Sequence, residues 1–174
     1  MDFKIATWNI IFLFRTGICQ NLVEVLNVYK IKVAGIQEVR WAGKGQLKER
    51  RYIIYFSGME ERYQNGCGFV VHETIEPYIK EFNPILERLA VLKIDTAPIN
   101  IVLICTYAPT ESADEDTKDI FYEDLIQAYD NLPGNAIKIL GVFNAKYGRE
   151  TQFSHTLGKE SLHDTSNGNG LRLI

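Results

Sequence analysis

Four polar side chains stand where apolar stretches of the chain end, and they are the candidates for chemistry. Asn9 and Glu38 follow two short apolar stretches near the start of the chain, and Tyr107 and Asn144 follow two more. In α/β sheets, ligands bind outside the carboxyl ends of the strands. An amide and a carboxylate at neighbouring strand ends supply the oxygen ligands that divalent cations prefer. The pattern therefore predicts a shared cation site at Glu38 and Asn9, with Tyr107 and Asn144 at comparable strand ends.

The start of the chain predicts a compact α/β unit that positions Asn9 and Glu38. Residues 3–8 alternate in polarity, which is typical of a strand. Residues 18–29 carry apolar side chains at helical spacing with polar ones between them, which indicates an amphipathic helix. Residues 33–36 form a second short strand that leads into Glu38. This order brings both polar side chains to strand ends.

The middle of the chain is a series of strands without intervening helices. The stretches that predict strands are Tyr52–Phe56, Cys67–Val71, Tyr78–Phe82, Arg88–Ile94 and Ile99–Thr106. Asn65-Gly66 lies between the first two and favours a hairpin turn. Asn83-Pro84 and residues 96–98 are expected to link the later strands. Consecutive strands joined by short links favour antiparallel pairing.

Residues 41–51 are polar and contain glycine, and we expect a loop there. Its basic side chains are Lys44, Lys48, Arg50 and Arg51. Two interpretations remain open at this point. The loop is either a solvated connection or a rim that contacts the phosphates of a ligand.

A second helix is expected at Ser112–Leu132. Ser112 with Glu115 three residues later matches a capping box. The expected buried stripe consists of Phe121, Tyr122, Leu125, Ile126, Tyr129 and Leu132. The acidic residues between them indicate a solvated face, with a metal cluster as the alternative. Pro133-Gly134 ends the helix, and residues 137–140 form the strand before Asn144.

The last part of the chain carries a weaker signal. Residues 149–170 are polar and are expected to form a loop. His163-Asp164 lies within it and is not expected to take part in chemistry, because adjacent side chains rarely point the same way. Residues 171–174 read as the beginning of another element.

The composition is that of an ordinary globular protein, and we expect residues 1–174 to form a single domain. Apolar residues make up 46% and charged residues 24%, which excludes a disordered composition. The net charge of −3 lacks the basic excess typical of nucleic-acid binders, although a small cleft can still be basic. Cys19, Cys67 and Cys105 are too far apart for zinc spacing and do not indicate a disulfide framework.

Neither a signal peptide nor a membrane-spanning stretch is recognisable in the sequence. We therefore expect an intracellular protein, nuclear or cytoplasmic, with no membrane partner. The sequence contains no heptad pattern and no repeat, so it leaves the oligomeric state open.

Four short motifs follow one another at the expected strand ends, and together they resemble those of the endonuclease/exonuclease/phosphatase family. They are Thr7-Trp8-Asn9, Gln37-Glu38, Tyr107-Ala108-Pro109 and Gly141-Val142-Phe143-Asn144. Each motif is weak by itself, and the order and spacing carry the resemblance. The likeness extends to the retrotransposon-derived members, such as LINE endonuclease domains and the craniofacial development protein group.

The resemblance implies a four-layer α/β sandwich, with two mixed sheets face to face and helices outside. It implies hydrolysis of phosphate esters with Mg²⁺ or Mn²⁺ as cofactor and a nucleic acid, DNA, as partner. By position, Glu38 would hold the metal and Asn9 would complete the local shell. Tyr107 would contact the scissile phosphate or the attacking water, and Asn144 would stabilise charge that builds on the phosphate.

Two departures from the family pattern predict an impaired site. Val142 stands where the family has an aspartate that activates the attacking water, and losing a general base costs about 10²–10⁴ in rate. The family's closing Ser-Asp-His motif is absent, so the chain would correspond to roughly the first two-thirds to three-quarters of a family domain, incomplete at its C-terminus. We therefore expect a degenerate endonuclease-like domain of retrotransposon origin.

Three alternatives remain open from the sequence. The chain is a non-catalytic module that binds nucleic acid or protein, a product without function, or a phosphatase acting on inositol lipids or small phosphates. Fold alone does not separate nuclease from phosphatase.

Overall fold

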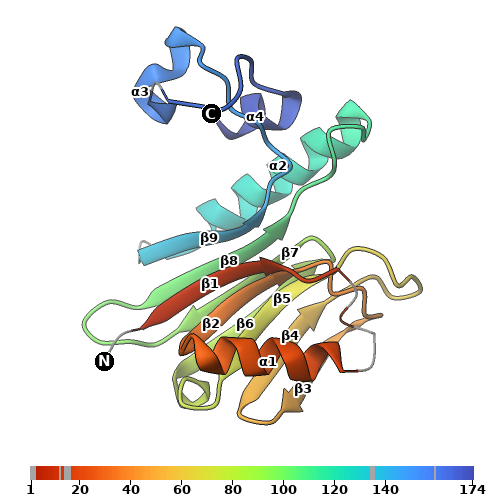
Figure 1. The fold of residues 1–174 in the computed structure, drawn as a ribbon, viewed down its shortest axis with the longest axis vertical. Helices are drawn as coiled ribbons and strands as arrows, with labels where there is room; N and C mark the ends of the chain where they lie inside the picture. The colour runs from red at the N-terminus through yellow and green to blue at the C-terminus, as the bar shows by residue number, and fades with distance from the viewer. Residues whose placement is uncertain (1–2, 12, 14–16, 134–135, 159) are drawn as a thin grey trace. The chain divides into compact units, whose positions relative to one another are not determined.

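Figure 1 shows the fold as a computed structural model, which describes residues 3–11, 13, 17–133, 136–158 and 160–174. The contacts within the chain divide it into two compact units. The first unit consists of Met1–Tyr107 and Leu132–Gly141, and the second of Ala108–Asn131 and Val142–Ile174. Two of the three chain boundaries between them, after Tyr107 and after Gly141, fall inside the third and fourth sequence motifs, and the other follows Asn131.

The first unit contains a mixed five-stranded sheet, sheet A, with the order β1-β2-β5-β4-β3. Its strands are β1 (Lys4–Asn9), β2 (Ile31–Gln37), β3 (Lys44–Glu49), β4 (Tyr52–Ser57) and β5 (Cys67–His72). Strands β1 and β2 are parallel, and the other neighbours are antiparallel. The parallel register pairs Asn9 with Gln37, so the carboxyl ends of the first two strands meet at one edge of the sheet.

The second sheet of this unit, sheet B, has the order β6-β7-β8-β9. Its strands are β6 (Ile79–Leu86), β7 (Leu89–Ile94), β8 (Ile101–Tyr107) and β9 (Ala136–Val142), and the short helix η1 (Glu76–Tyr78) precedes them. The first three strands are antiparallel neighbours, as predicted for the middle of the chain. Gly141 allows β9 to approach β8 closely, because a Cβ atom at this position would lie 2.0 Å from the carbonyl oxygen of Thr106.

The two sheets pack face to face around the main core. Its buried side chains are Val33, Ile53, Tyr55, Cys67, Phe69 and Val71 from sheet A, and Ala90, Leu92, Ile94, Leu103 and Cys105 from sheet B. Helix α1 (Ile18–Val28) covers the other face of sheet A with Leu22, Val23 and Leu26 (Figure 1). Full burial of one such side chain stabilises the fold by roughly 1.5–3 kcal/mol. The α/β class with two packed sheets is confirmed.

Two stretches of the first unit differ from the prediction. Residues 44–49, expected in a loop, form strand β3, and residues 83–84, expected as a link, continue strand β6. Both strands lie at the edge of their sheet, where one side stays exposed and the apolar alternation is weak. Pro84 is compatible with this place because proline is tolerated in edge strands.

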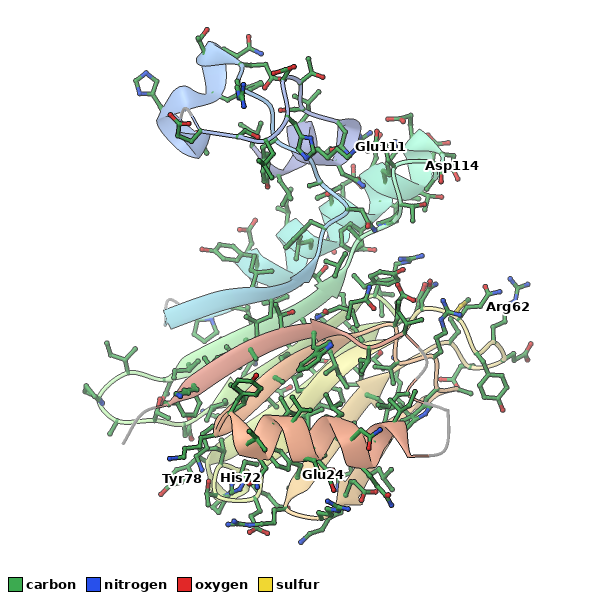
Figure 2. The ribbon with its side chains drawn as sticks, in the orientation of Figure 1. Glu24, Arg62, His72, Tyr78, Glu111 and Asp114 are labelled. Carbon is green, nitrogen blue, oxygen red and sulfur yellow. The ribbon has the colours of Figure 1, made fainter. Side chains whose placement is uncertain are left out.

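The second unit contains α2 (Glu115–Asp130), η2 (Thr151–Phe153), α3 (Ser154–Leu157) and α4 (Gly168–Leu173). The loop predicted at residues 149–170 is therefore partly helical, and the element expected from residue 171 is the end of α4. The predicted capping box at Ser112 is wrong, because Asp114 caps α2 and accepts a 2.8 Å hydrogen bond from the Thr117 N–H. Figure 2 labels Asp114 at this end of the helix.

The buried face of α2 is also shifted from the predicted stripe. Ile126 and Tyr129 are 58% and 47% exposed, whereas Lys118 and Ala128 are buried with Phe121. Phe121, Tyr122 and Leu125 are buried as predicted, with Lys118 and Ala128 in place of Ile126 and Tyr129. On the acidic face, Arg172 pairs with Glu115 and Asp119. Two of the acidic residues thus form ion pairs with α4.

In the part of the chain that the structure describes, no helix is long and apolar enough to cross a membrane.

Candidate active site

Glu38 follows the last residue of β2 and adopts a rare backbone conformation. Its φ angle is 58°, in the left-handed region that few non-glycine residues occupy. Such a conformation costs of order 1–3 kcal/mol and persists where the surrounding structure enforces it. The next two residues are held by backbone hydrogen bonds, Val39 N–H to the Gly66 carbonyl at 3.1 Å and Arg40 N–H to the Asn65 carbonyl at 2.8 Å. The turn therefore fixes the direction of the Glu38 side chain.

Three donors converge on the Glu38 carboxylate. Asn9 Nδ2 and the Tyr107 hydroxyl each donate to Oε1 at 3.0 Å. Arg40 Nη2 donates to Oε2 at 3.0 Å and forms an ion pair with it. The Glu38 side chain is only 13% exposed, so these contacts replace most of its hydration. The structure thus brings together three of the four residues predicted from the sequence.

The three donors set the protonation states of this cluster. Burial alone would raise the pKa of Glu38, but hydrogen bonds from Asn9, Tyr107 and Arg40 and the Arg40 charge together lower it. Glu38 is therefore ionised at neutral pH. Burial, the hydrogen bond to Glu38 and the carboxylate charge raise the pKa of Tyr107. Tyr107 is therefore a protonated donor and not a phenolate.

Gln37 anchors the end of β2 beneath Glu38. Its side chain is fully buried and exchanges hydrogen bonds with the Thr7 hydroxyl of β1 at 3.2 and 3.3 Å. Its Nε2 also donates to the sulfur of Cys105 in β8 at 3.2 Å. Because buried amides need partners, these contacts tie the three strands together directly behind the carboxylate.

Asn144, the fourth predicted residue, belongs to the second unit, and so does Val142. The φ angle of Asn144 is 51°, and its Nδ2 donates to the carbonyls of Ala108 at 2.8 Å and Pro109 at 3.3 Å. Its own carbonyl accepts a hydrogen bond from Asn167 Nδ2 at 3.0 Å. Val142 ends β9, is half-buried and accepts the Ala108 N–H at 2.8 Å. Asn144 is thus held within its own unit by hydrogen bonds between side-chain amides and main-chain carbonyls.

Sequence reasoning missed Arg40, which contacts the carboxylate directly. A cation two residues after Glu38 is the only signal that the sequence offers for it. Two basic side chains of residues 44–51 pair with carboxylates elsewhere, Arg50 with Glu24 and Arg51 with Glu73. Lys44 donates to the Pro84 carbonyl at 2.9 Å. These contacts favour the solvated interpretation of that stretch over a phosphate-contacting rim.

The residues present are compatible with a divalent cation at one carboxylate. Among the described residues, no group of three or more His, Cys, Asp and Glu side chains could hold a metal. Mg²⁺ commonly binds through one or two carboxylates together with waters and substrate phosphates. Glu38 supplies such a carboxylate and Asn9 an amide oxygen, whereas the Arg40 ion pair competes for Oε2. The donor set fits a weak site that substrate would complete.

Comparisons with known proteins identify the fold. No family model matches the sequence. The chain is 29% identical over 150 residues to craniofacial development protein 2 of Tragulus javanicus and of Bos taurus, covering 86% of the chain. It spans about a quarter of the length of these curated relatives, 26% and 25%.

Solved structures with the same fold include the following three. The endonuclease domain of TRAS1, a telomere-specific non-LTR retrotransposon, has a TM-score of 0.65 at 13% identity, with 99% of this chain and 68% of that one covered. An endonuclease/exonuclease/phosphatase family protein from Leptotrichia buccalis gives 0.56 at 12% identity, with coverage of 82% and 67%. D. rerio TDP2 complexed with single strand DNA product gives 0.53 at 15% identity, with coverage of 91% and 66%. The chain therefore has the fold of the endonuclease/exonuclease/phosphatase family.

Proposed function

We propose that this chain is a metal-dependent phosphodiesterase domain of the endonuclease type that acts on DNA. The observation that carries the proposal is the convergence of Asn9, Tyr107 and Arg40 on the Glu38 carboxylate. A neutral amide, a protonated hydroxyl and a cation around one carboxylate provide both a cation ligand and phosphate donors. Similarity to the TRAS1 endonuclease domain and to TDP2, which was solved with single strand DNA product, supports this substrate class.

In this proposal, Glu38 and Asn9 would hold Mg²⁺ or Mn²⁺. When bound, such a cation offsets the negative charge by which a phosphodiester resists attack. The Tyr107 hydroxyl keeps its proton at neutral pH and donates a hydrogen bond to a phosphate oxygen or to the attacking water. Preorganised donors of this kind act where charge grows during the reaction. The Arg40 guanidinium, which pairs with Glu38 Oε2 in the structure, would be a charged donor to a phosphate oxygen.

In this proposal, Asn144 would contribute a neutral donor and would give up only its longer hydrogen bond. Its Nδ2 already donates to two carbonyls, and the contact with Pro109 is the longer one at 3.3 Å. Donation to a phosphate oxygen would replace this contact and keep the 2.8 Å bond to Ala108. The remaining bond would keep the amide oriented.

Val142 limits the rate that we expect. Valine cannot accept a proton, and the loss of a general base lowers a rate by about 10²–10⁴. The substitution Val142→Asp supplies a carboxylate at the position where the family has aspartate. We therefore expect weak nicking by the chain itself and faster nicking by Val142→Asp.

The test is nicking of supercoiled plasmid with Mg²⁺ or Mn²⁺ by the chain, Val142→Asp, and the double variant Glu38→Gln/Val142→Asp. Glu24→Gln is the matched control, because it removes an exposed carboxylate on α1 (Figure 2). We expect nicking by Val142→Asp that Glu38→Gln abolishes and Glu24→Gln leaves unchanged. Equal rates for Val142→Asp with and without Glu38→Gln, or no nicking by any variant, would overturn the proposal.

A second candidate function is DNA binding without cleavage, which the valine at position 142 and the Glu38–Arg40 ion pair favour. A carboxylate that already has a protein cation does not require a metal. Fluorescence anisotropy with a labelled duplex tests this function. Binding that survives Glu38→Gln, weakens with salt and occurs without nicking even in Val142→Asp supports it. Absence of binding at low salt excludes it.

A further inference from the structure

Arg88, the residue before β7, holds Tyr107 in three ways. Its Nη1 donates to the Tyr107 carbonyl at 3.1 Å, and its own carbonyl accepts the Tyr107 N–H at 3.0 Å. Its guanidinium carbon lies 5.0 Å from the centroid of the Tyr107 ring, within the range of a cation–π contact. One residue therefore fixes both backbone groups and the ring of Tyr107.

Asn65 connects Arg88 with the turn that carries Glu38. Arg88 Nη2 donates to Asn65 Oδ1 at 2.9 Å, and the Asn65 carbonyl accepts the Arg40 N–H at 2.8 Å. The Asn65 φ angle of 57° lies in the left-handed region, which asparagine tolerates better than most residues. Arg40 in turn pairs with Glu38, and Glu38 accepts from Tyr107. The contacts thus close a ring of side-chain and main-chain bonds around the candidate site.

We propose that Arg88 and Asn65 are positioning residues that hold the Tyr107 hydroxyl and the Glu38 carboxylate against each other. This inference rests on the proposed function for its catalytic meaning, but the positioning itself can be measured without activity. Arg88 is half-buried, and its guanidinium donates to Tyr107 and Asn65, so we place its effect on the site through Tyr107. Its planar guanidinium provides donors in two directions at once while its face lies on the ring.

Lysine cannot reproduce this arrangement, and this makes Arg88→Lys the informative substitution. A lysine keeps the positive charge but has a single nitrogen, and it cannot donate to Tyr107 and Asn65 while also stacking. Asn65→Gly is the second variant, because glycine accepts the left-handed conformation. It removes the Oδ1 acceptor of Arg88 and the weak 3.9 Å contact from Asn65 Nδ2 to the Met59 sulfur. Arg62→Lys is the control, since Arg62 is exposed in the loop before β5 (Figure 2).

The first readout is NMR titration of Tyr107 and Glu38 with ¹³C-labelled side chains, with Tyr107→Phe and Glu38→Gln as assignment controls. If Arg88 and Asn65 position the pair, Arg88→Lys and Asn65→Gly both weaken the hydrogen bond between Tyr107 and Glu38. We then expect the pKa of Tyr107 to fall and the pKa of Glu38 to rise, because this hydrogen bond raises the first and lowers the second. Arg62→Lys leaves both titrations unchanged. A purely structural role would lower the unfolding midpoint without these opposite shifts. Titrations in Arg88→Lys and Asn65→Gly that match the parent would overturn the inference.

The second readout is a double-mutant cycle in the Val142→Asp background. Tyr107→Phe and Arg88→Lys should each lower kcat about tenfold with little change in KM, and the double variant should lose no more than the single ones. Fully additive losses would contradict positioning through Tyr107. If no variant nicks DNA but the NMR shifts occur, the positioning stands and the proposed function fails. If nicking occurs without the shifts, the function stands and the positioning fails.

Discussion

The Tyr107 hydroxyl donates a hydrogen bond of 3.0 Å to Oε1 of Glu38, although the two residues lie 69 positions apart in the sequence. This contact joins the end of β8 in sheet B to the end of β2 in sheet A. A charge-assisted hydrogen bond contributes about 1.5–3 kcal/mol when it is well formed and shielded. The contact is therefore part of the candidate site and also a hydrogen bond that links the two sheets.

Tyr107→Phe is expected to lower the free energy of unfolding by about 1–2 kcal/mol at pH 7, because it removes this donor and keeps the packed ring. Urea denaturation followed by circular dichroism measures the change. Tyr78→Phe is the control, since Tyr78 is exposed beside the first strand of sheet B and should change stability by less than about 0.5 kcal/mol. Equal effects of the two substitutions would show that the Tyr107–Glu38 hydrogen bond does not stabilise the fold.

The contribution of Glu38 to stability is expected to depend on pH in one direction. Its pKa is lower in the folded chain than the value of about 4.3 expected for an unfolded one, so the unfolded state binds its proton first as the pH falls. The stabilisation is fully present above the unfolded pKa and is lost as the pH falls through the folded pKa. The stability difference between the parent and Glu38→Gln should therefore be constant near neutral pH and shift against the parent in acid. Urea denaturation midpoints between pH 7 and pH 3 measure this difference in stability. A difference that moves in favour of the parent in acid would contradict the predicted pH dependence.

Gly141→Ala is expected to destabilise the chain by roughly 2–4 kcal/mol, because the new Cβ would lie 2.0 Å from the Thr106 carbonyl oxygen and force β9 away from β8. Thermal unfolding measures this loss. Gly17→Ala is not a suitable control because its φ angle is 85°. Ala113→Gly is the comparison, because it also changes the chain by one methyl group but lies in the segment before α2. A Gly141→Ala variant with parental stability would mean that the two strands are not so close.

Thr106→Val is expected to leave stability unchanged or to raise it slightly. The Thr106 hydroxyl is buried and has no hydrogen-bond partner among the residues that the structure describes. An unsatisfied buried polar group costs about 1–3 kcal/mol, and valine has nearly the same shape without that cost. A loss of more than about 1 kcal/mol in chemical denaturation would indicate that the hydroxyl has a partner such as buried water.

The strands and helices of the first unit could largely be predicted from the sequence, because their apolar residues repeat with clear periods. Parallel pairing of β1 and β2 explains why Asn9 and Glu38 meet as expected. The edge strand β3 could not be recognised, because its exposed side makes it read as a polar loop. Arg40 and Arg88 were missed for a different reason. Their roles depend on contacts across 19 or more positions or on a tight turn, and a linear pattern contains no signal for either.

Asn167→Ala is expected to loosen the backbone around Asn144. Asn167 caps α4 by accepting the Gly170 N–H at 2.8 Å, and its Nδ2 donates to the Asn144 carbonyl at 3.0 Å. Loss of a helix cap costs about 1 kcal/mol, and the Asn144 carbonyl loses a partner as well. Amide hydrogen exchange should become faster at Gly170 and at residues next to Asn144. Asn21→Ala, on the exposed face of α1, is the control, and equal protection in both variants would contradict the link.

The two edge strands described above also affect how copies of the chain meet. A strand that added to the open side of β3 would have to desolvate or displace Lys44 and Lys48, which lie four residues apart and so on the same side of the pleat. A strand that added to β6 would meet Pro84, which has no N–H to offer. Lysine and proline at open sheet edges are the usual obstacles to cross-β growth. The residues that make these two strands difficult to predict from the sequence therefore also disfavour the addition of a further strand at β3 and β6.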